Sequence, residues 1–184
     1  MMNVRKIEQA DFKNEVERFI SHGKHGIIYG VVENPYVQVH RDTQVDKDIC
    51  SKFGYGIVEL FHNGGTLVLN PGDMVMGHFG SIGNGWYERF VSYFLEWLKA
   101  RGLNAEYTSN DILVDGFKVS AYCVTVYGRI DYTGIFIGIS TNLDHVKAIC
   151  RKPMVKVPKG LSDYGITTEE VERMFLDFCE KDEN

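Results

Sequence analysis

The sequence of 184 residues contains only four prolines and four cysteines, and it has no long uninterrupted apolar segment. The cysteines stand at positions 50, 123, 150 and 179 without a CxxC pair, so the pattern predicts neither a disulfide framework nor a zinc site. The N-terminus lacks the apolar region of a signal peptide, and no segment approaches the ~20 apolar residues of a membrane helix. We therefore expect a soluble, unprocessed cytoplasmic protein with reduced thiols.

Motifs of several common enzyme classes are also missing. None of the six histidines belongs to an HxH or HExxH pattern, and the chain has no GxxxxGK[ST] loop, no GxGxxG fingerprint and no GxSxG elbow. The 20 basic and 25 acidic residues give a formal charge of −5, which argues against a nucleic-acid partner. The length and the 44% apolar content predict one domain, residues 1–184, with a sizeable core.

Helical periodicity and capping signals predict four helices. The first ends before Gly23, the second has Asn84 as its N-cap and a stripe of aromatic residues, and the last opens with a capping box of Thr167 and Glu170. The predicted helices cover residues 9–21, 84–102 and 142–150, and a C-terminal segment that begins at Thr167.

Short β-rich segments bounded by glycine and asparagine predict the strands, which cover residues 26–32, 56–61, 66–69, 112–114, 117–127 and 132–140. The Asp115-Gly116 pair favours a type I′ turn between two of them. Strict alternation along residues 117–127 would place Phe117, Val119, Ala121 and Cys123 on one face, with Lys118, Ser120 and Tyr122 on the other. We predict an α+β fold in which about four helices flank a mixed, largely antiparallel sheet.

The first candidate site is the segment Asn63, Gly64, Gly65 and Thr66 between two predicted strands. Backbone N–H groups of such a turn can converge on an anion, and the missing side chains let a carboxylate or phosphate approach the main chain. An Asn-Gly pair between β-rich segments is equally typical of a plain hairpin, here with a tight turn between two strands. The residues alone leave both interpretations open.

The second candidate site joins Asn110 and Asp111 to Lys118, which follows beyond the Asp115-Gly116 turn. On a hairpin this spacing can bring an acid and a cation to the same end of the sheet. A lysine among apolar and small residues is unfavourable unless an anion pairs with it. The alternative is an exposed hairpin lysine, because lysine is mostly found at the surface.

A basic segment, residues 145–162, contains five lysines and arginines and no carboxylate, although the whole chain is acidic. Such a segment can attract a phosphate or an acidic protein, or it can simply be solvated. Within it, Cys150 precedes two cations that could lower the pKa of its thiol, which makes it a candidate nucleophile, with a buried and inert thiol as the alternative. The cations are Lys147, Arg151, Lys152, Lys156 and Lys159.

Taken in order, five segments resemble the biotin/lipoate protein ligase superfamily, and specifically its lipoate-protein ligase A branch. The third segment is similar to the family signature in which Asn-Asp precedes a Gly-x-Lys-(Ile/Val)-Ser motif. The segments are IIYGVVENPY, HNGGTLVLNPGDMV, NDILVDGFKVSAYC, TGIFIGISTNLDHVKAICRKP and KGLSDYGITTEEV. The resemblance covers roughly residues 27–171 and implies a sheet like that of biotin ligases and class II aminoacyl-tRNA synthetases.

The resemblance implies an enzyme that activates lipoate or octanoate with ATP and Mg²⁺ and transfers the acyl group to a lysine of a lipoyl-acceptor domain. Such acceptors belong to 2-oxoacid dehydrogenase acyltransferase subunits or are glycine cleavage H proteins. Lys118 matches the lysine at the reaction centre, and Asn110 and Asp111 match the nucleotide contact, with Asp111 as a transient Mg²⁺ ligand. The implied substrate-binding residues are Asn63, Gly64, Gly65, Thr66, Ser120, Ala121, Thr133 and Gly134.

The chain departs from the family pattern at several polar positions. Leu60 stands in place of an arginine, and Leu69 and Thr133 stand in place of histidines. Two alternatives therefore stay open: an octanoyl or lipoyl transferase that forms a thioester on Cys150, and a non-catalytic module that binds an acyl group or a nucleotide. The resemblance ends near the last predicted helix, so we expect no C-terminal accessory domain.

Overall fold

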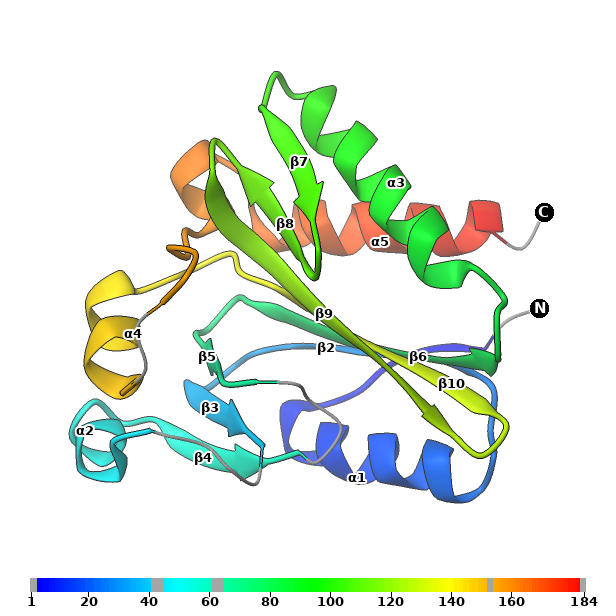
Figure 1. The fold of residues 1–184 in the computed structure, drawn as a ribbon, viewed down its shortest axis with the longest axis horizontal. Coiled ribbons are helices and arrows are strands. Elements are labelled where there is room, and N and C mark those ends of the chain that lie inside the picture. The colour runs from blue at the N-terminus through cyan, green and yellow to red at the C-terminus, as the bar shows by residue number, and fades with distance from the viewer. Residues whose placement is uncertain (1–2, 41–44, 61–64, 152–153, 183–184) are drawn as a thin grey trace.

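A twisted seven-stranded sheet runs through the computed structural model, which describes residues 3–40, 45–60, 65–151 and 154–182 (Figure 1). The strand order is β1-β2-β6-β10-β9-β8-β7, and every pair is antiparallel except the parallel pair of β1 and β2. The strands are β1 (Val4–Lys6), β2 (Gly26–Val31), β6 (Met74–Ser81), β7 (Ala105–Thr108), β8 (Asp111–Val114), β9 (Phe117–Tyr127) and β10 (Ile130–Ile137). The prediction of a largely antiparallel mixed sheet is confirmed.

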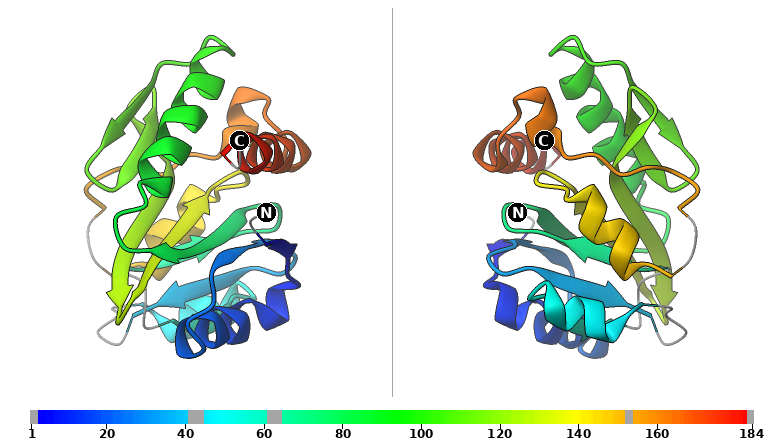
Figure 2. Two further views of the ribbon diagram at one scale, coloured as in Figure 1. Left: turned by 90° about the vertical axis from the view of Figure 1, so that its right-hand side faces the viewer. Right: turned by 90° about the vertical axis from the view of Figure 1, so that its left-hand side faces the viewer.

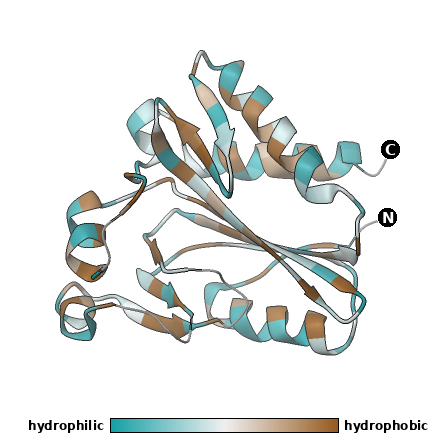
Figure 3. Ribbon diagram, viewed as in Figure 1, coloured by the Kyte–Doolittle hydropathy of each residue, from teal (hydrophilic) through white to brown (hydrophobic). Residues whose placement is uncertain are grey.

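Helices cover both faces of this sheet, so its central strands are buried on both sides (Figures 1 and 2). Consecutive residues of β2 show this, because Ile27 packs in the cluster under α3 (Trp86–Lys99) and α5 (Thr168–Asp182), whereas Ile28 packs in the cluster under α1 (Gln9–Ser21). Figure 3 shows hydrophobic and hydrophilic residues alternating along these helices, as amphipathic helices require. The helices are α1 (Gln9–Ser21), α3 (Trp86–Lys99) and α5 (Thr168–Asp182), and a 3₁₀ turn, η1 (Leu161–Tyr164), precedes α5.

Helix ends follow the predicted signals with one difference. The capping box before α5 forms in both directions, from the Thr167 N–H to the Glu170 carboxylate and from the Glu170 N–H to the Thr167 hydroxyl. At α3 the N-cap is Gly85, in the left-handed conformation, and not Asn84. The Asn84 side-chain oxygen Oδ1 still accepts a hydrogen bond from the Trp86 N–H at 2.9 Å, so the side chain caps from one position further out. None of the described helices is long and apolar enough to cross a bilayer.

A second, three-stranded sheet lies beside the large one and has the order β4-β3-β5. Its strands are β3 (Tyr36–Val39), β4 (Gly56–Glu59) and β5 (Leu67–Leu69), and its own small core contacts α2 (Lys47–Lys52) and α4 (Leu143–Ile149). The predicted hairpin between the strands near 56–61 and 66–69 is wrong, because β3 lies between β4 and β5. Strand β3 was not predicted from the sequence, and neither were β1, α2, β6 and β7.

A β-bulge changes the direction of the side chains in β9. The register to β8 shifts between Ile112, which lies opposite Ser120, and Leu113, which lies opposite Lys118, so Val119 is the extra residue. The predicted alternation along the whole strand is therefore wrong. Val119 packs in the core under α3 and α5, whereas Lys118, Ala121 and Cys123 line a cavity together.

Candidate functional site

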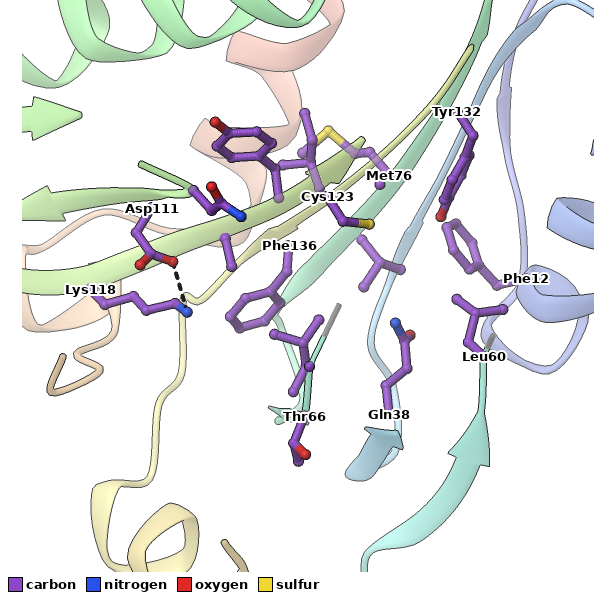
Figure 4. Close-up of a pocket in the computed structure, with 18 residues that line it drawn as sticks. Phe12, Gln38, Leu60, Thr66, Met76, Asp111, Lys118, Cys123, Tyr132 and Phe136 are labelled. Carbon is purple, nitrogen blue, oxygen red and sulfur yellow. Dashed lines mark ion pairs between the residues drawn. The ribbon is translucent and has the colours of Figure 1, made fainter. Parts of the chain in front are cut away.

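A cavity of about 290 Å³ lies between the large sheet and the small sheet. Its walls come from α1, β3, β5, β6, β8, β9 and β10 and are mostly apolar (Figure 4). Phe12, Leu60, Val75, Ile135 and Phe136 supply much of this surface. The volume is at the lower end of the ~300–1,000 Å³ typical of small-molecule sites, so it suits one medium-sized apolar group.

A cluster of three charged side chains stands at one end of the cavity. Asp111 forms ion pairs with two lysines, through Oδ1 to Lys118 Nζ at 2.8 Å and through Oδ2 to Lys156 Nζ at 2.8 Å. Lys156 also donates to the Thr108 hydroxyl at 2.8 Å. The carboxylate side chain is 14% exposed and each lysine side chain is 27% exposed, so water reaches the ammonium groups more easily than the acid. We call Asp111, Lys118 and Lys156 the charged cluster.

The backbone fixes Lys118 in this position from two sides. Its N–H donates to the Val157 carbonyl at 2.9 Å, and its own carbonyl accepts from the Lys159 N–H at 3.0 Å. Residues 157–159 thus run parallel to the bulged part of β9, with a bridge between Lys118 and Pro158. These contacts bring Lys156 to the other oxygen of Asp111.

The charged cluster carries a net charge of +1 when Asp111 is ionised. Burial acts to raise the pKa of Asp111, but the hydrogen bonds and charges of Lys118 and Lys156 outweigh it and hold the pKa below its usual value. Two ammonium groups with one carboxylate leave unused N–H donors, which favours an anionic ligand at this end of the cavity.

Seven of the residues predicted for the site line the cavity: Gly65, Thr66, Asn110, Asp111, Lys118, Ala121 and Gly134. Ser120 and Thr133 do not belong to this lining, because their side chains are buried elsewhere in the sheet. The Ser120 hydroxyl donates to the Phe136 carbonyl at 2.6 Å. Asn63 and Gly64 lie outside the described residues.

Cys150 lies away from this cavity, at the end of α4, where it bridges to Val45 beside the small sheet. Burial raises the pKa of its thiol, which favours the alternative of an inert thiol. Of the neighbouring cations, Arg151 pairs with Asp46 at 3.1 Å. A nucleophilic role for Cys150 stays a prediction.

The basic segment, residues 145–162, matches neither predicted alternative as a whole, because several of its cations have partners within the protein. Besides Lys156 in the charged cluster and Arg151 in its ion pair, Lys159 places its ammonium 4.3 Å from the ring centroid of Tyr164. This distance is within the range of a cation–π contact. Lys152 lies outside the described residues.

Four residues with polar or ionisable side chains in or beside the cavity were not predicted from the sequence. Lys156 was seen only as part of a basic segment, and Gln38, Cys123 and Tyr132 gave no motif at all. Cys123 and Tyr132 approach each other over Gly134, because a Cβ atom on that glycine would lie 2.7 Å from Tyr132 Oη and 3.1 Å from Cys123 Sγ. The alternating pattern of β9 and β10 could have suggested Cys123, since strands expose every second residue to one face.

The charged cluster is a poor Mg²⁺ site. Both oxygens of Asp111 already bind ammonium groups, and the described residues contain no group of three or more His, Cys, Asp or Glu side chains that could hold a metal. A site with a net positive charge does not fit a Mg²⁺ ion held by the protein alone, because that ion needs carboxylates or phosphate oxygens. The cluster fits a carboxylate or a phosphate.

Comparisons with known proteins identify a family and several similar folds. Residues 7–176 match the family model described as the lipoyl protein ligase A/B catalytic domain. No curated protein sequence matches the chain. Among solved structures, the chain is similar to a Thermoplasma acidophilum protein with bound lipoic acid, with 13% identity, a TM-score of 0.79, and 98% of this chain and 85% of that chain covered.

Two further structures are similar over almost the whole chain. A lipoate-protein ligase A bound with ATP has 14% identity and a TM-score of 0.80, with 98% of this chain and 84% of that chain covered. A bipartite lipoate protein ligase from Thermoplasma acidophilum, described with its E2 lipoyl domain, has 14% identity and a TM-score of 0.78 over the same shares. At these identities the likeness shows the fold, and the family-model match over residues 7–176 shows the family. The chain belongs to the lipoyl protein ligase A/B catalytic domain family.

Proposed function

We propose that this protein is a lipoate-protein ligase-like enzyme that activates lipoate or octanoate with ATP and transfers the acyl group to a lysine of a lipoyl-acceptor domain. The observation that carries the proposal is the combination of an apolar cavity with the charged cluster at one end. An apolar chain bound along the walls would bring its carboxylate to the Lys118 ammonium. Similar structures with lipoic acid and with ATP support this assignment.

The chain's own residues suit the two half-reactions. In the first, a carboxylate oxygen of the acid attacks the α-phosphorus of ATP, the bond to pyrophosphate breaks, and an acyl-adenylate forms. Lys118, as a compact cation, stabilises the charge that develops on the phosphate oxygens. The Asp111 carboxylate holds Lys118 in place, and Asn110 offers an amide on the same side of the cavity. Mg²⁺ would enter with the phosphates of ATP.

In the second half-reaction the amine of the acceptor lysine attacks the acyl carbonyl carbon, an amide bond forms, and AMP leaves. No covalent intermediate on the enzyme is needed. A cavity of about 290 Å³ has room for the acyl chain but not also for the AMP portion, so the anhydride would lie toward the charged cluster. We propose as acceptors the lipoyl domain of a 2-oxoacid dehydrogenase acyltransferase subunit or a glycine cleavage H protein; one similar ligase is described with its E2 lipoyl domain.

The decisive experiment is ATP–pyrophosphate exchange with lipoate and with octanoate. Exchange that depends on the acid is the expected result, and its rate should fall by roughly 10²- to 10³-fold in Lys118→Met. Calorimetry with the acid alone is the companion measurement. Acid binding without exchange would identify a non-catalytic acyl-binding module and overturn the ligase. A stable acyl adduct that Cys150→Ser abolishes would identify a thioester transferase instead.

A further inference from the structure

One polar side chain in the cavity wall has no role in the mechanism above. Gln38 lies on β3, the central strand of the small sheet, and it is only 5% exposed. The described residues give its side-chain amide no hydrogen-bond partner. Figure 4 shows the amide pointing into the cavity, with Phe136 between it and Lys118.

The position of Gln38 in the strand makes this amide unexpected. Alternation along β3 turns Tyr36 and Gln38 toward the large sheet and turns Val37 and Val39 toward α2 and α4. In the cavity Gln38 shares the wall with the apolar residues Phe12, Leu60 and Leu67, and it also borders a second pocket whose lining includes Gln9, Lys13 and Asn14. The amide atoms of Gln38 are not among the fully buried polar atoms without a partner in the described residues, so they face open space, and a ligand in the cavity that pairs with the amide would gain a hydrogen bond that an apolar side chain could not give.

Other groups that can form hydrogen bonds lie at the same end of the cavity. Tyr132 Oη and Cys123 Sγ both stand close to the position that a side chain on Gly134 would occupy. Figure 4 shows Cys123 and Tyr132 on the side of the cavity away from Lys118, with Phe12 and Leu60 beside Gln38. The cavity therefore has a cationic end for a carboxylate and a polar spot within its apolar distal end.

Resting on the proposed function, we propose that Gln38 is a specificity-determining residue that selects a medium-chain carboxylic acid with a heteroatom in its distal half. A sulfur atom of a dithiolane ring or a terminal hydroxyl would accept a hydrogen bond from the Gln38 amide. A plain alkyl end, as in octanoate, would leave the amide without a partner. One hydrogen bond of this kind should change affinity by roughly 3- to 10-fold.

The test compares the dissociation constants of lipoate, 8-hydroxyoctanoate and octanoate by calorimetry for the wild type, Gln38→Met and Leu67→Met. The wild type should bind the two acids with a heteroatom roughly 3- to 10-fold more tightly than octanoate. Gln38→Met keeps an unbranched side chain without the amide, so the preference should vanish while octanoate binds at least as tightly as before. Leu67→Met changes another wall residue without changing polarity, and it should keep the preference.

Three results would overturn the assignment. A wild type that binds octanoate as tightly as both other acids has no such selectivity, and this measurement stands even if Gln38→Met fails to fold. A Gln38→Met variant that keeps the preference would exclude the amide as its source. If none of the three acids binds the folded wild type, the proposed function fails as well, whereas binding without preference removes only the role of Gln38.

Discussion

Lys118 and Lys156 offer a matched pair for testing the charged cluster. Both ammonium groups lie 2.8 Å from an oxygen of the same carboxylate, and both side chains are 27% exposed. They differ in their relation to the cavity, since Lys118 lines it and Lys156 does not. Replacing each by methionine therefore separates the role in folding from the role in binding.

Either substitution removes one charge-assisted hydrogen bond to Asp111 and leaves the other. The expected loss in the free energy of unfolding is about 1.5–3 kcal/mol for each variant. Lys156→Met should lie at the upper end, because Lys156 also donates to the Thr108 hydroxyl. Urea denaturation of the two variants measures this effect.

Function should respond to only one of the two changes. Lys118→Met removes the cation next to the bound carboxylate, so the dissociation constant for lipoate should rise about 10- to 100-fold. The rate of ATP–pyrophosphate exchange should fall by roughly 10²- to 10³-fold, as expected when a group that stabilises transition-state charge is lost. Lys156→Met should change both quantities by less than about threefold. Equal losses in the two variants, or an unchanged affinity in Lys118→Met, would refute the central position given to Lys118.

Three further predictions concern pH, cavity space and thiol access. Burial lowers the pKa of His78 to about 4 and raises that of Asp73 to about 6. As the pH falls from 6.5 to 4, His78 binds a proton in the unfolded chain but not in the folded protein, which lowers the free energy of unfolding. Asp73 binds a proton in the folded protein at a higher pH than in the unfolded chain, which raises the free energy of unfolding. The two effects are each on the order of 3 kcal/mol and nearly cancel in the wild type. Each variant keeps only one of them, so acidification should stabilise His78→Gln and destabilise Asp73→Asn in thermal or urea unfolding. The same dependence of stability on pH in both variants would contradict this. In Gly134→Ala, the new Cβ would crowd Tyr132 Oη at 2.7 Å, so calorimetry should show weaker lipoate binding, whereas Gly56→Ala, whose nearest contact would be 3.8 Å, should bind normally. Finally, bound lipoate should protect Cys123 from alkylation without protecting Cys150, as measured by peptide mass spectrometry; equal protection of both thiols would place the acid elsewhere.

Much of the fold was predictable because local signals agree with the tertiary structure. The φ angles of Asp115 and Gly116, +53° and +79°, confirm the type I′ turn that the dipeptide favours. The central strand β6 was missed because glycine and histidine interrupt its apolar pattern. Gly77 has a packing reason, since a Cβ there would meet the rings of Phe79 and Tyr132 at 3.2–3.3 Å.

The site was predictable only where its residues are close in the sequence. Asp111 and Lys118 belong to one hairpin, so their spacing alone suggested an ion pair. Lys156 joins them through a parallel bridge from a distant segment, which no local pattern encodes. Gln38 looks like a solvent-facing residue in an alternating strand, and only the packing of both sides of β3 reveals that it is buried.

The bulge at Val119 also limits how this strand can vary in length. Deleting Val119, the extra residue, would keep Lys118 and Ala121 on the cavity side, because they would then stand two positions apart in a regular strand. A one-residue insertion or deletion elsewhere in β9, with the bulge kept, would exchange the two sides for everything on one flank of the change. If Lys118 lay on that flank, its ammonium would point among the isoleucine and phenylalanine side chains under α3, where an unpaired charge is strongly unfavourable. The strand should therefore lose a residue at Val119 far more easily than it gains or loses one anywhere else.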